Sequence, residues 1–389
     1  MKIALIAPCP VPYAVGGAQR LWWGWADYMN AHTAHAVELL QIPSPEHDFF
    51  SVVRSYERFF NLNLDHFDRV VSGKYPAWMV QHRDHRVYML HRLRGLYDTY
   101  GAQDAAASLP AHDDFSLSRD VLTLSAQARA NTRADIAQLF TLVAQIDLHG
   151  GAERARYTFP GPLAKLVVQT LDGFALSTNR VASFAALSKT VRDRRDYFPV
   201  DAEVEVIYPP TAMPNTASGN AKHFLAASRF DGPKRMDLII SAFKKTTVDM
   251  PLKMIGEGPT LAACKALAQS DRRIEFLGFV PDQTLATLYS DALATLFVPQ
   301  DEDYGLVTLE SFTAARPVIT ATDSGGPCEL VKHGYNGWVV EPTVAAVSGA
   351  ITAAASDVTA TLAKGRQGAV TASAITWAKL SDWTARAQP

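Results

Sequence analysis

The sequence predicts an α/β protein with two doubly wound domains in tandem, the first of which carries a helical insertion. The chain has 389 residues, and at roughly 100–200 residues per domain this length allows two or three domains. Short apolar segments alternate with helical patterns along both halves of the chain, as in parallel sheets that helices cover on both faces. A polar, proline-rich tract separates the two series, which favours two domains joined by a linker.

The first domain begins with a strand, a glycine turn and a helix. Ile3–Ala7 is an apolar segment typical of a buried parallel strand, the following loop ends at Gly16 and Gly17, and Ala18–Tyr28 has a helical pattern. In such a unit, ligands bind beyond the carboxyl end of the strand. The fingerprint G-x-G-x-x-G is absent, which disfavours a dinucleotide-dependent oxidoreductase.

Further strands and a helical region complete this domain, which we place at residues 1–212. Residues 98–166 carry apolar side chains at helical spacing, which predicts helices inserted in the domain or packed on it, and another helix is expected to run through Arg195. The remaining strands are expected at Ala36–Ile42, Arg69–Val71, Val87–Leu90, Phe184–Ser188 and Val204–Tyr208. Pro209-Pro210 and the tract Pro214–Asn220 form the predicted linker.

The second domain, residues 213–374, repeats the alternation of strands and helices. Its strands are expected at Phe224–Ala227, Pro251–Ile255, Ile274–Leu277, Ala294–Val298, Pro317–Thr320 and Gly337–Val340. Its helices are expected at Met236–Lys245, Leu261–Gln269, Asp282–Ser290 and Leu306–Ala314. We expect the C-terminal helix, residues 375–389, to pack back on the first domain, with Trp377 and Trp383 either as its anchors or as exposed contacts with a partner.

Charge and cysteine content exclude several classes of function. The 37 Lys and Arg residues against 39 Asp and Glu give a formal net charge of −2, so no global positive field exists to hold a nucleic acid. Cys9, Cys264 and Cys328 are odd in number and scattered, which fits neither a disulfide framework nor a zinc cluster and indicates a reducing, cytoplasmic setting. We expect neither a signal peptide nor a membrane-spanning helix, which needs about 20 apolar residues. Peripheral contact with the inner face of a membrane stays open, and the sequence predicts no oligomeric state.

The most informative run is Gln300–Glu310, which follows a predicted strand and enters a helix. Gly305 allows a tight turn there. Leu306, Val307 and the residues after them would supply the free amides of a helix start, and such amides bind phosphate oxygens. The run therefore predicts an anion site.

Two carboxylates, Glu302 and Glu310, flank this anion site. A carboxylate repels a diphosphate, so a functional role for both residues requires hydroxyl groups as their partners, such as those of a sugar and of a ribose. The alternative is that Glu302 is a solvated loop charge and that Glu310 is a favourable acid near a helix N-terminus.

Loops after the other strands of the second domain add cations and glycines. Arg229 and Lys234 follow the first strand, where Arg could bind a diphosphate bidentately and Lys as a point charge. Gly256 and Gly258 would permit a ligand to approach the backbone after the second strand. After the third strand, Phe279 and Val280 could form an apolar wall against a nucleobase. Taken alone, each run fits solvated cations or ordinary strand-end turns as well.

Together, the order and spacing of these runs resemble the donor-binding half of family 4 glycosyltransferases of the GT-B fold. The resemblance is close over residues 220–342 and looser in the first domain. The motifs that carry it are Arg229 with Lys234, Gly256-x-Gly258-Pro259, Gly278-Phe279-Val280, the Glu302-x7-Glu310 pair, Ser324-Gly-Gly-Pro-x-Glu329 and Asn336-Gly-Trp, with Gly16-Gly17, Ser188–Arg192 and Val206–Pro210 as the looser matches. It implies two Rossmann-like domains that face a cleft.

The resemblance also implies a role for each matching residue. Arg229 and Lys234 would neutralise the donor diphosphate as it leaves, and Glu302 and Glu310 would bind the hydroxyls of the donor sugar and of the ribose. Contacts to the phosphates, the sugar or the base are implied for Gly17, Val280, Tyr304, Gly305 and Leu306. Transfer would retain the anomeric configuration, with the departing diphosphate helping to deprotonate the acceptor and with no metal or cofactor required.

His91 directly follows an apolar strand of the first domain and resembles the strand-end histidine of the family. The proline that usually follows that histidine is replaced here by Arg92-Leu93. A neutral imidazole at this position could hydrogen-bond the donor sugar or the acceptor hydroxyl, and the alternative is a histidine satisfied at a strand end. His82 and His85 have no Cys or carboxylate partner at ligand spacing, so we interpret both as surface loop histidines.

Cations and aromatic residues alternate in the segment around His91. They are Lys74, Arg83, Arg86, Arg92 and Arg94, with Tyr75, Trp78, Met79 and Tyr88 between them. One interpretation is a basic, aromatic face that touches anionic lipid or a lipid-linked diphosphate acceptor. The other is a solvated rim over core aromatics.

These inferences predict a retaining glycosyltransferase that moves a sugar from a nucleotide-diphosphate sugar to a hydroxyl of a glycan or lipid-linked acceptor, in bacterial surface polysaccharide assembly. Its expected catalytic residues are Glu302, His91, Arg229 and Lys234, which act by positioning and by electrostatic stabilisation. The alternatives are another GT-B enzyme, either a nucleotide-sugar epimerase or a phosphorylase, and an inactive sugar-binding subunit.

Overall fold

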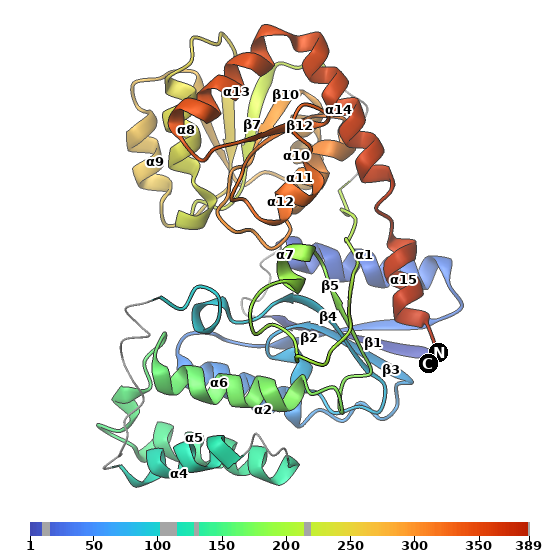
Figure 1. Cartoon of the computed structure of the whole chain (residues 1–389), viewed down its shortest axis with the longest axis vertical. Coiled ribbons are helices and arrows are strands. Elements are labelled where there is room, and N and C mark those ends of the chain that lie inside the picture. The colour runs from blue at the N-terminus through green and yellow to red at the C-terminus, as the bar shows by residue number, and fades with distance from the viewer. Residues whose placement is uncertain (10–15, 102–114, 128–131, 214–218, 388–389) are drawn as a thin grey trace. The chain divides into compact units, whose positions relative to one another are not determined.

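The computed structural model describes residues 1–9, 16–101, 115–127, 132–213 and 219–387 (Figure 1). The chain divides into two compact units. Unit 1 comprises Met1–Leu187, Val191–Ile207 and Ser381–Pro389, and unit 2 comprises Ser188–Thr190 and Tyr208–Leu380. The chain thus changes units at residue 207, whereas the sequence placed this boundary at residue 212. Most of the predicted linker tract, residues 214–218, lies outside the described residues.

Unit 1 is built on a parallel sheet with the strand order β2-β1-β3-β4-β5-β6. Its strands are β1 (Lys2–Cys9), β2 (Ala36–Pro43), β3 (Arg69–Lys74), β4 (His85–His91), β5 (Ser183–Ala186) and β6 (Val204–Val206). Residues Ile3 to Ala7 of β1 are at most 1% exposed, because helices cover both faces of a sheet of this kind.

Helices of unit 1 lie on both sides of this sheet, α1 on one side and two layers, α2 with α6 and then α4 with α5, on the other (Figure 1). The helices are α1 (Gly17–His32), α2 (Phe49–Phe60), α4 (Ser116–Gln127), α5 (Arg133–His149) and α6 (Pro162–Ala175), with 3-10 turns η1 (Ala77–Met79), η2 (Arg94–Leu96) and η4 (Arg154–Arg156). The short helix α7 (Lys189–Arg192) begins in unit 2 and ends in unit 1. The expected helical region contains α4, α5 and the start of α6, and α4 and α5 pack over α2 and α6. The helix expected to run through Arg195 is shorter than predicted, since α7 ends at Arg192.

A buried carboxylate, that of Asp172 on α6, holds the layers of unit 1 together. It is fully buried and accepts hydrogen bonds from the Tyr56 hydroxyl (2.7 Å), the Trp78 indole (2.7 Å) and the Tyr97 hydroxyl (2.6 Å). The Arg92 guanidinium lies 3.5 Å away. Burial and the Asp172 carboxylate raise the pKa of Tyr56 and Tyr97 well above the usual value, so both phenols stay protonated and donate.

Two buried arginines dock the C-terminal helix α15 (Trp377–Ala385) on the sheet of unit 1. Arg69 and Arg86 donate to backbone carbonyls of residues 383–386 at the end of this helix, where the helix dipole favours positive charge. Trp383 is 1% exposed and its indole donates to the Ser183 hydroxyl at 3.1 Å. Of the two predicted anchors, only Trp383 is buried in unit 1, because unit 1 takes up the helix from Ser381 onward. Trp377 is half-exposed and belongs to unit 2.

The basic, aromatic face predicted around His91 is not an exposed face. Arg86 and Arg92 are buried and bonded to protein groups. The aromatic and Met side chains of the segment, Tyr75, Trp78, Met79 and Tyr88, are at most 5% exposed. The interpretation as core aromatics is correct for this segment, because the alternating side chains of β4 and the η1 turn point into the interior rather than toward a lipid surface.

The prediction of a surface loop histidine at position 85 is wrong. His85 lies in β4, is 1% exposed, and its Nε2 atom is 2.8 Å from the Ser72 hydroxyl. Burial lowers its pKa to about 3, because an interior of low dielectric disfavours the imidazolium. His82 is half-exposed and contacts only backbone groups.

Acid should therefore destabilise unit 1 through His85. Its folded-state pKa of about 3 lies below the unfolded value of 6.5, so the unfolded chain binds the extra proton between these values, and stability falls as the pH falls below 6.5. From pH 6.5 to 4.5 the expected loss is about 2 kcal/mol in the free energy of unfolding. Urea titrations at several pH values should show a smaller loss in His85→Gln, and an equal loss in the variant would contradict this role.

Unit 2 is built on a second parallel sheet, with the strand order β12-β11-β10-β7-β8-β9. Its strands are β7 (His223–Ala227), β8 (Leu252–Ile255), β9 (Ile274–Gly278), β10 (Ala292–Leu296), β11 (Val318–Ala321) and β12 (Gly337–Val340). The predicted strand ends differ from these by at most two residues. The chain runs outward from β7 to β9 and then returns to β10, so the sheet has a topological switch point between β7 and β10.

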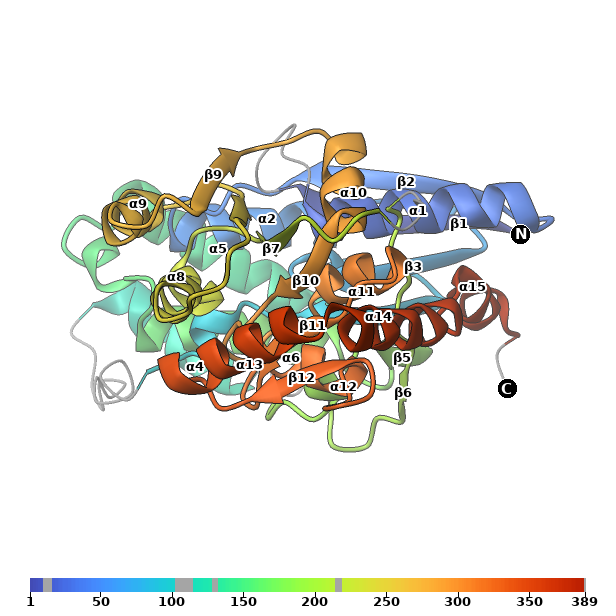
Figure 2. The same cartoon turned by 90° about the horizontal axis from the view of Figure 1, so that it is seen from above.

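The helices of unit 2 cover both faces of its sheet (Figure 2). They are α8 (Met236–Lys244), α9 (Leu261–Ala268), α10 (Asp282–Ser290), α11 (Leu306–Thr313), α12 (Gly326–Leu330), α13 (Val344–Ser356) and α14 (Val358–Ser373), with the 3-10 turn η5 (Gly232–Lys234). The sequence did not predict α13 and α14. Helix α13 packs on α8, and α14 runs beside α11.

Within the described ranges, no helix has by itself the length and apolarity needed to cross a membrane. Taken together, the helical segments Val344–Ser356 and Val358–Ala385 reach the length and apolarity of a membrane span, by length and composition only, but the pair is bent by 104° at its break.

Candidate functional site

The predicted site residues of unit 2 lie together at one edge of its sheet. Each motif directly follows the carboxyl end of a strand, so the strand order sets the order of the loops. The loops that flank the switch point are those after β7, with Arg229 and Lys234, and after β10, with Glu302 and Gly305. In open parallel sheets, ligands bind at such a switch point.

An ion pair between Lys234 and Glu302 joins the two loops at the switch point. The Lys234 ammonium donates to the Glu302 carboxylate, and the Gln300 amide donates to the Pro233 carbonyl at 2.8 Å. Both side chains are largely buried, with 13% and 21% exposed. An ammonium has three N–H donors, so one bond to Glu302 leaves two that can reach an anionic ligand.

Arg229 lies beside this pair but reaches into solvent. Its side chain is 77% exposed and its guanidinium is 3.1 Å from the Asp231 carboxylate. A guanidinium has five donors, so the contact with Asp231 leaves a planar fork for a phosphate. Sequence reasoning missed Asp231 as the partner of Arg229.

Helix α11 begins at the switch point with a glycine cap. Gly305 has φ +77°, and a Cβ atom there would lie 2.7 Å from Phe297 and 2.9 Å from Pro327, so only glycine fits this turn. The geometry of the helix start supplies no intrahelical acceptor for the amides of Leu306 and Val307. The side chain of Tyr304 is buried, so at this residue only the backbone can serve a ligand.

Glu310 and Val280 are connected through Tyr289. The Tyr289 hydroxyl donates to the Glu310 carboxylate at 2.8 Å, and the Tyr289 ring belongs to the apolar cluster on which Val280 packs. The predicted base wall and the predicted ribose carboxylate therefore border the same apolar cluster. Phe279, next to Val280, is 70% exposed.

Gly256 and Gly258 are required by the packing of one loop on another. A Cβ atom would lie 2.0 Å from the Ser228 carbonyl oxygen at position 256 and 2.3 Å from the Phe230 carbonyl oxygen at position 258. Their φ angles of +125° and +155° also exclude other residues. The close approach to the loop that carries Arg229 accounts for both glycines, and a ligand contact at either of them stays a prediction.

Gly256→Ala should therefore displace the Arg229 loop. We expect a loss of about 2 kcal/mol or more in the free energy of unfolding, since the backbone and its neighbour must both shift, and weaker binding of a nucleoside diphosphate. Urea unfolding and calorimetric titration measure the two effects. The control is Gly349→Ala, because nothing lies within 4 Å of a Cβ atom at that helical glycine; equal behaviour of both variants would contradict the role given to Gly256.

Three predicted site residues, Gly16, Gly17 and His91, lie in unit 1. Gly16 is the N-cap of α1 with φ −127°, a conformation open to any residue, so the backbone does not explain a glycine there. Gly17 is the first residue of α1, whose amide has no intrahelical acceptor. His91 ends β4, so α1 and His91 both follow carboxyl ends of the sheet of unit 1.

His91 is a neutral imidazole with a defined tautomer. Burial lowers its pKa to about 3. Its Nδ1 atom lies 2.8 Å from the Arg92 carbonyl oxygen, and because a carbonyl only accepts, Nδ1 carries the proton. The Nε2 atom is then an acceptor. Arg92, the residue after His91, is held by the Tyr197 carbonyl and by Asp172.

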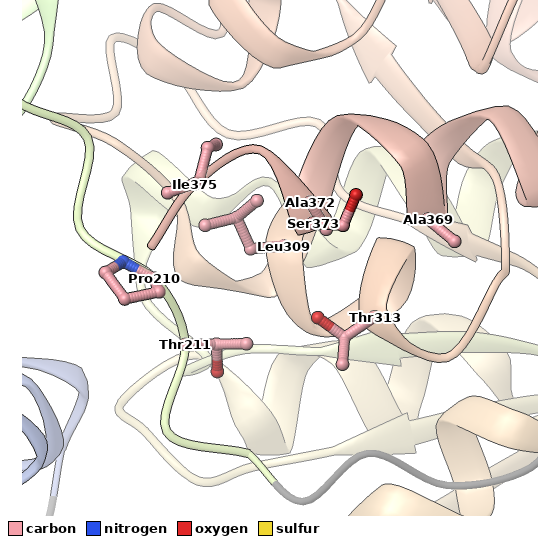
Figure 3. Close-up of a pocket in the computed structure, with 8 residues that line it drawn as sticks. All are labelled: Pro210, Thr211, Leu309, Thr313, Ala369, Ala372, Ser373 and Ile375. Carbon is pink, nitrogen blue, oxygen red and sulfur yellow. The ribbon is translucent and has the colours of Figure 1, made fainter. Parts of the chain in front are cut away.

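A cavity of about 370 Å³ lies between α11, the end of α14 and the segment at Pro210 (Figure 3). Its lining residues are Pro210, Thr211, Leu309, Thr313, Ala369, Ala372, Ser373 and Ile375. None of them is a predicted site residue. Over the described ranges, no three His, Cys, Asp or Glu side chains cluster in a way that could hold a metal ion.

Comparison with solved structures identifies the fold as GT-B. HepE from Anabaena in complex with UDP-glucose superimposes with a TM-score of 0.61 at 14% identity, over 99% of this chain and 98% of HepE. Two parallel six-stranded sheets with helices, as described above, define this two-domain α/β fold.

Residues 212–364, which span most of unit 2, match the family model of group 1 glycosyl transferases. An exopolysaccharide phosphotransferase of Streptomyces coelicolor is 31% identical over 144 residues, 34% of this chain and 15% of the relative. The lipopolysaccharide 1,6-galactosyltransferase of Salmonella typhimurium is 25% identical over 152 residues, 36% of this chain and 42% of the relative. The matched segments thus span less than half of both relatives.

Proposed function

We propose that this chain is a retaining glycosyltransferase that moves a sugar from a nucleotide-diphosphate sugar to a hydroxyl of a glycan or lipid-linked acceptor. The observation that carries the proposal is the Lys234–Glu302 pair at the switch point of the unit 2 sheet, next to the glycine-capped start of α11. Cations and free amides suit the diphosphate, and carboxylates suit sugar hydroxyls.

In this proposal, catalysis is electrostatic. As the bond between the sugar and the diphosphate breaks, negative charge grows on the leaving oxygen. Lys234, Arg229 and the first amides of α11 stabilise that charge without reorganising. Glu302 orients the donor sugar, Glu310 binds the ribose, and the Nε2 atom of His91 accepts a hydrogen bond from a sugar or acceptor hydroxyl. The reaction requires no metal and no cofactor.

The similar proteins support the substrate class. HepE has been crystallised with UDP-glucose, and the names of the two relatives refer to exopolysaccharide and lipopolysaccharide. We therefore assign the chain to the assembly of a bacterial surface polysaccharide. The donor sugar and the base stay open.

The first experiment is a thermal-shift screen against UDP-, GDP- and dTDP-sugars, since a ligand at 100 times its Kd stabilises the folded state by about 2.7 kcal/mol. The stabilising donor is then incubated with EDTA and with or without glycan acceptors. Release of nucleoside diphosphate only when acceptor is present, with retained anomeric configuration in the product, supports the proposal. Conversion of the donor to its epimer without acceptor indicates an epimerase, and dependence of the reaction on phosphate indicates a phosphorylase. Binding of the donor with no change in it, with or without acceptor, indicates a sugar-binding subunit.

A further inference from the structure

Glu329, on the short helix α12, has a carboxylate whose acceptor sites are all occupied. One oxygen accepts from the Thr190 amide (2.7 Å) and the Thr190 hydroxyl (2.6 Å). The other accepts from the Lys189 amide (2.9 Å) and the Tyr208 hydroxyl (2.7 Å). A carboxylate has about four acceptor positions, so Glu329 has none left for a substrate or a proton. Its role is to hold other parts of unit 2.

The residues that Glu329 holds belong to two separate stretches of chain. Ser188–Thr190 belongs to unit 2 although the residues on both sides of it belong to unit 1, and Tyr208 is the first residue of the long stretch of unit 2. Glu329 therefore fixes the chain at both of these entries into unit 2.

Both stretches in turn contact the two residues that follow Glu302. The Ser188 hydroxyl donates to the Asp303 carbonyl at 2.6 Å. The rings of Tyr208 and Tyr304 are stacked, with centroids 5.8 Å apart and planes inclined by 15°. The Tyr304 hydroxyl also donates to the Pro209 carbonyl at 3.0 Å.

The backbone of Glu302 is held from the other side by the turn that precedes Glu329. The Glu302 amide donates to the Ser324 carbonyl at 3.0 Å, and the Gly326 amide donates to the Glu302 carbonyl at 2.8 Å. The turn is tight, because a Cβ atom on Gly325 would lie 2.6 Å from the Glu302 carbonyl oxygen. Glu302 is thus enclosed between this turn and the stretches that Glu329 fixes.

We propose that Glu329 is a positioning residue for Glu302, which rests on the function proposed above. It sets the placement of the 302–304 backbone, and through it the Glu302 carboxylate, without touching the donor. Glutamine at this position tests this role with little change in shape. Only its oxygen can accept hydrogen bonds, and its NH₂ group would face two of the four donors.

The test compares Glu329→Gln with Glu341→Gln, which makes the same change at an exposed carboxylate of unit 2. Hydrogen exchange of the Glu302 and Gly326 amides reports the placement of the loop without need of activity. We expect about tenfold faster exchange of both amides in Glu329→Gln and no change in Glu341→Gln. Tyr208→Phe, which removes one of the four bonds, should give a smaller increase, and it replaces Glu329→Gln should that variant not fold.

Activity supplies the second readout. In Glu329→Gln we expect kcat to fall about tenfold or more while the Kd for the nucleoside diphosphate stays within about twofold, the split typical of a lost transition-state interaction. Faster exchange confined to residues 189–192, or unchanged kcat despite faster exchange at Glu302, would overturn the proposal. A wild-type chain without transferase activity would overturn the proposed function instead, and the exchange of Glu302 would still decide whether Glu329 positions this loop.

Discussion

Replacing Lys234 with alanine should lower the kcat of sugar transfer by about a hundred- to a thousandfold, the effect typical of removing one donor aimed at developing negative charge. Lys234 is largely buried and bonded to Glu302, so the substitution removes the cation that joins the two loops at the switch point and leaves the Glu302 carboxylate without it. The free energy of unfolding should fall by about 1–3 kcal/mol, because the largely buried Glu302 carboxylate loses its cation. Steady-state kinetics and urea unfolding measure the two quantities.

The matched control is Lys222→Ala. Lys222 is also an ion-paired lysine of unit 2, 2.9 Å from Asp291, but it precedes β7 and so lies at the opposite edge of the sheet. We expect wild-type turnover in this variant. Turnover of Lys234→Ala within twofold of the wild-type value would remove Lys234 from the proposed mechanism.

The fold of unit 2 could be predicted well because its strands are short and mostly apolar, and most of them border a glycine or proline. This is the pattern that parallel strands impose on a sequence, and it also located the loops at the carboxyl ends. Helices α13 and α14 were missed since their Ala-rich segments lack a clear polar face. In unit 1, α2 was missed because its sequence, FFSVVRSYERFF, mixes aromatic and β-branched residues that also suit strands.

The candidate site was predictable as a set of loops but not as a set of contacts. The glycine at position 305 and the charges at 234 and 302 are local features of the sequence. The hydrogen-bond partners of the motif carboxylates are not local features. Tyr289 donates to Glu310 and Thr190 donates to Glu329, and each partner is brought there by the packing of the fold. The same holds for His85, whose burial depends on the position of β4 inside the sheet of unit 1.

The largest stability effect is expected from Asp172→Ala, which should lower the free energy of unfolding of unit 1 by about 3–5 kcal/mol. The change leaves the buried Arg92 guanidinium without its carboxylate. It also leaves three hydrogen-bond donors, from α2, η1 and the segment after η2, without their acceptor. Unsatisfied buried groups of this kind lose their hydrogen bonds without regaining water. Urea unfolding followed by tryptophan fluorescence reports the loss, since Trp78 is one of the donors.

A second substitution separates the effect of the unpaired Arg92 charge from the effect of the three lost hydrogen bonds. If the uncompensated guanidinium carries most of the cost, Arg92→Met combined with Asp172→Ala should be more stable than Asp172→Ala alone, because the pair is coupled and its effects are not additive. The control Asp147→Ala breaks ion pairs with Arg54 and Arg154 on the surface and should cost no more than about 1 kcal/mol. A double variant no more stable than Asp172→Ala would show that the three hydrogen bonds, and not the charge of Arg92, make Asp172 indispensable to unit 1.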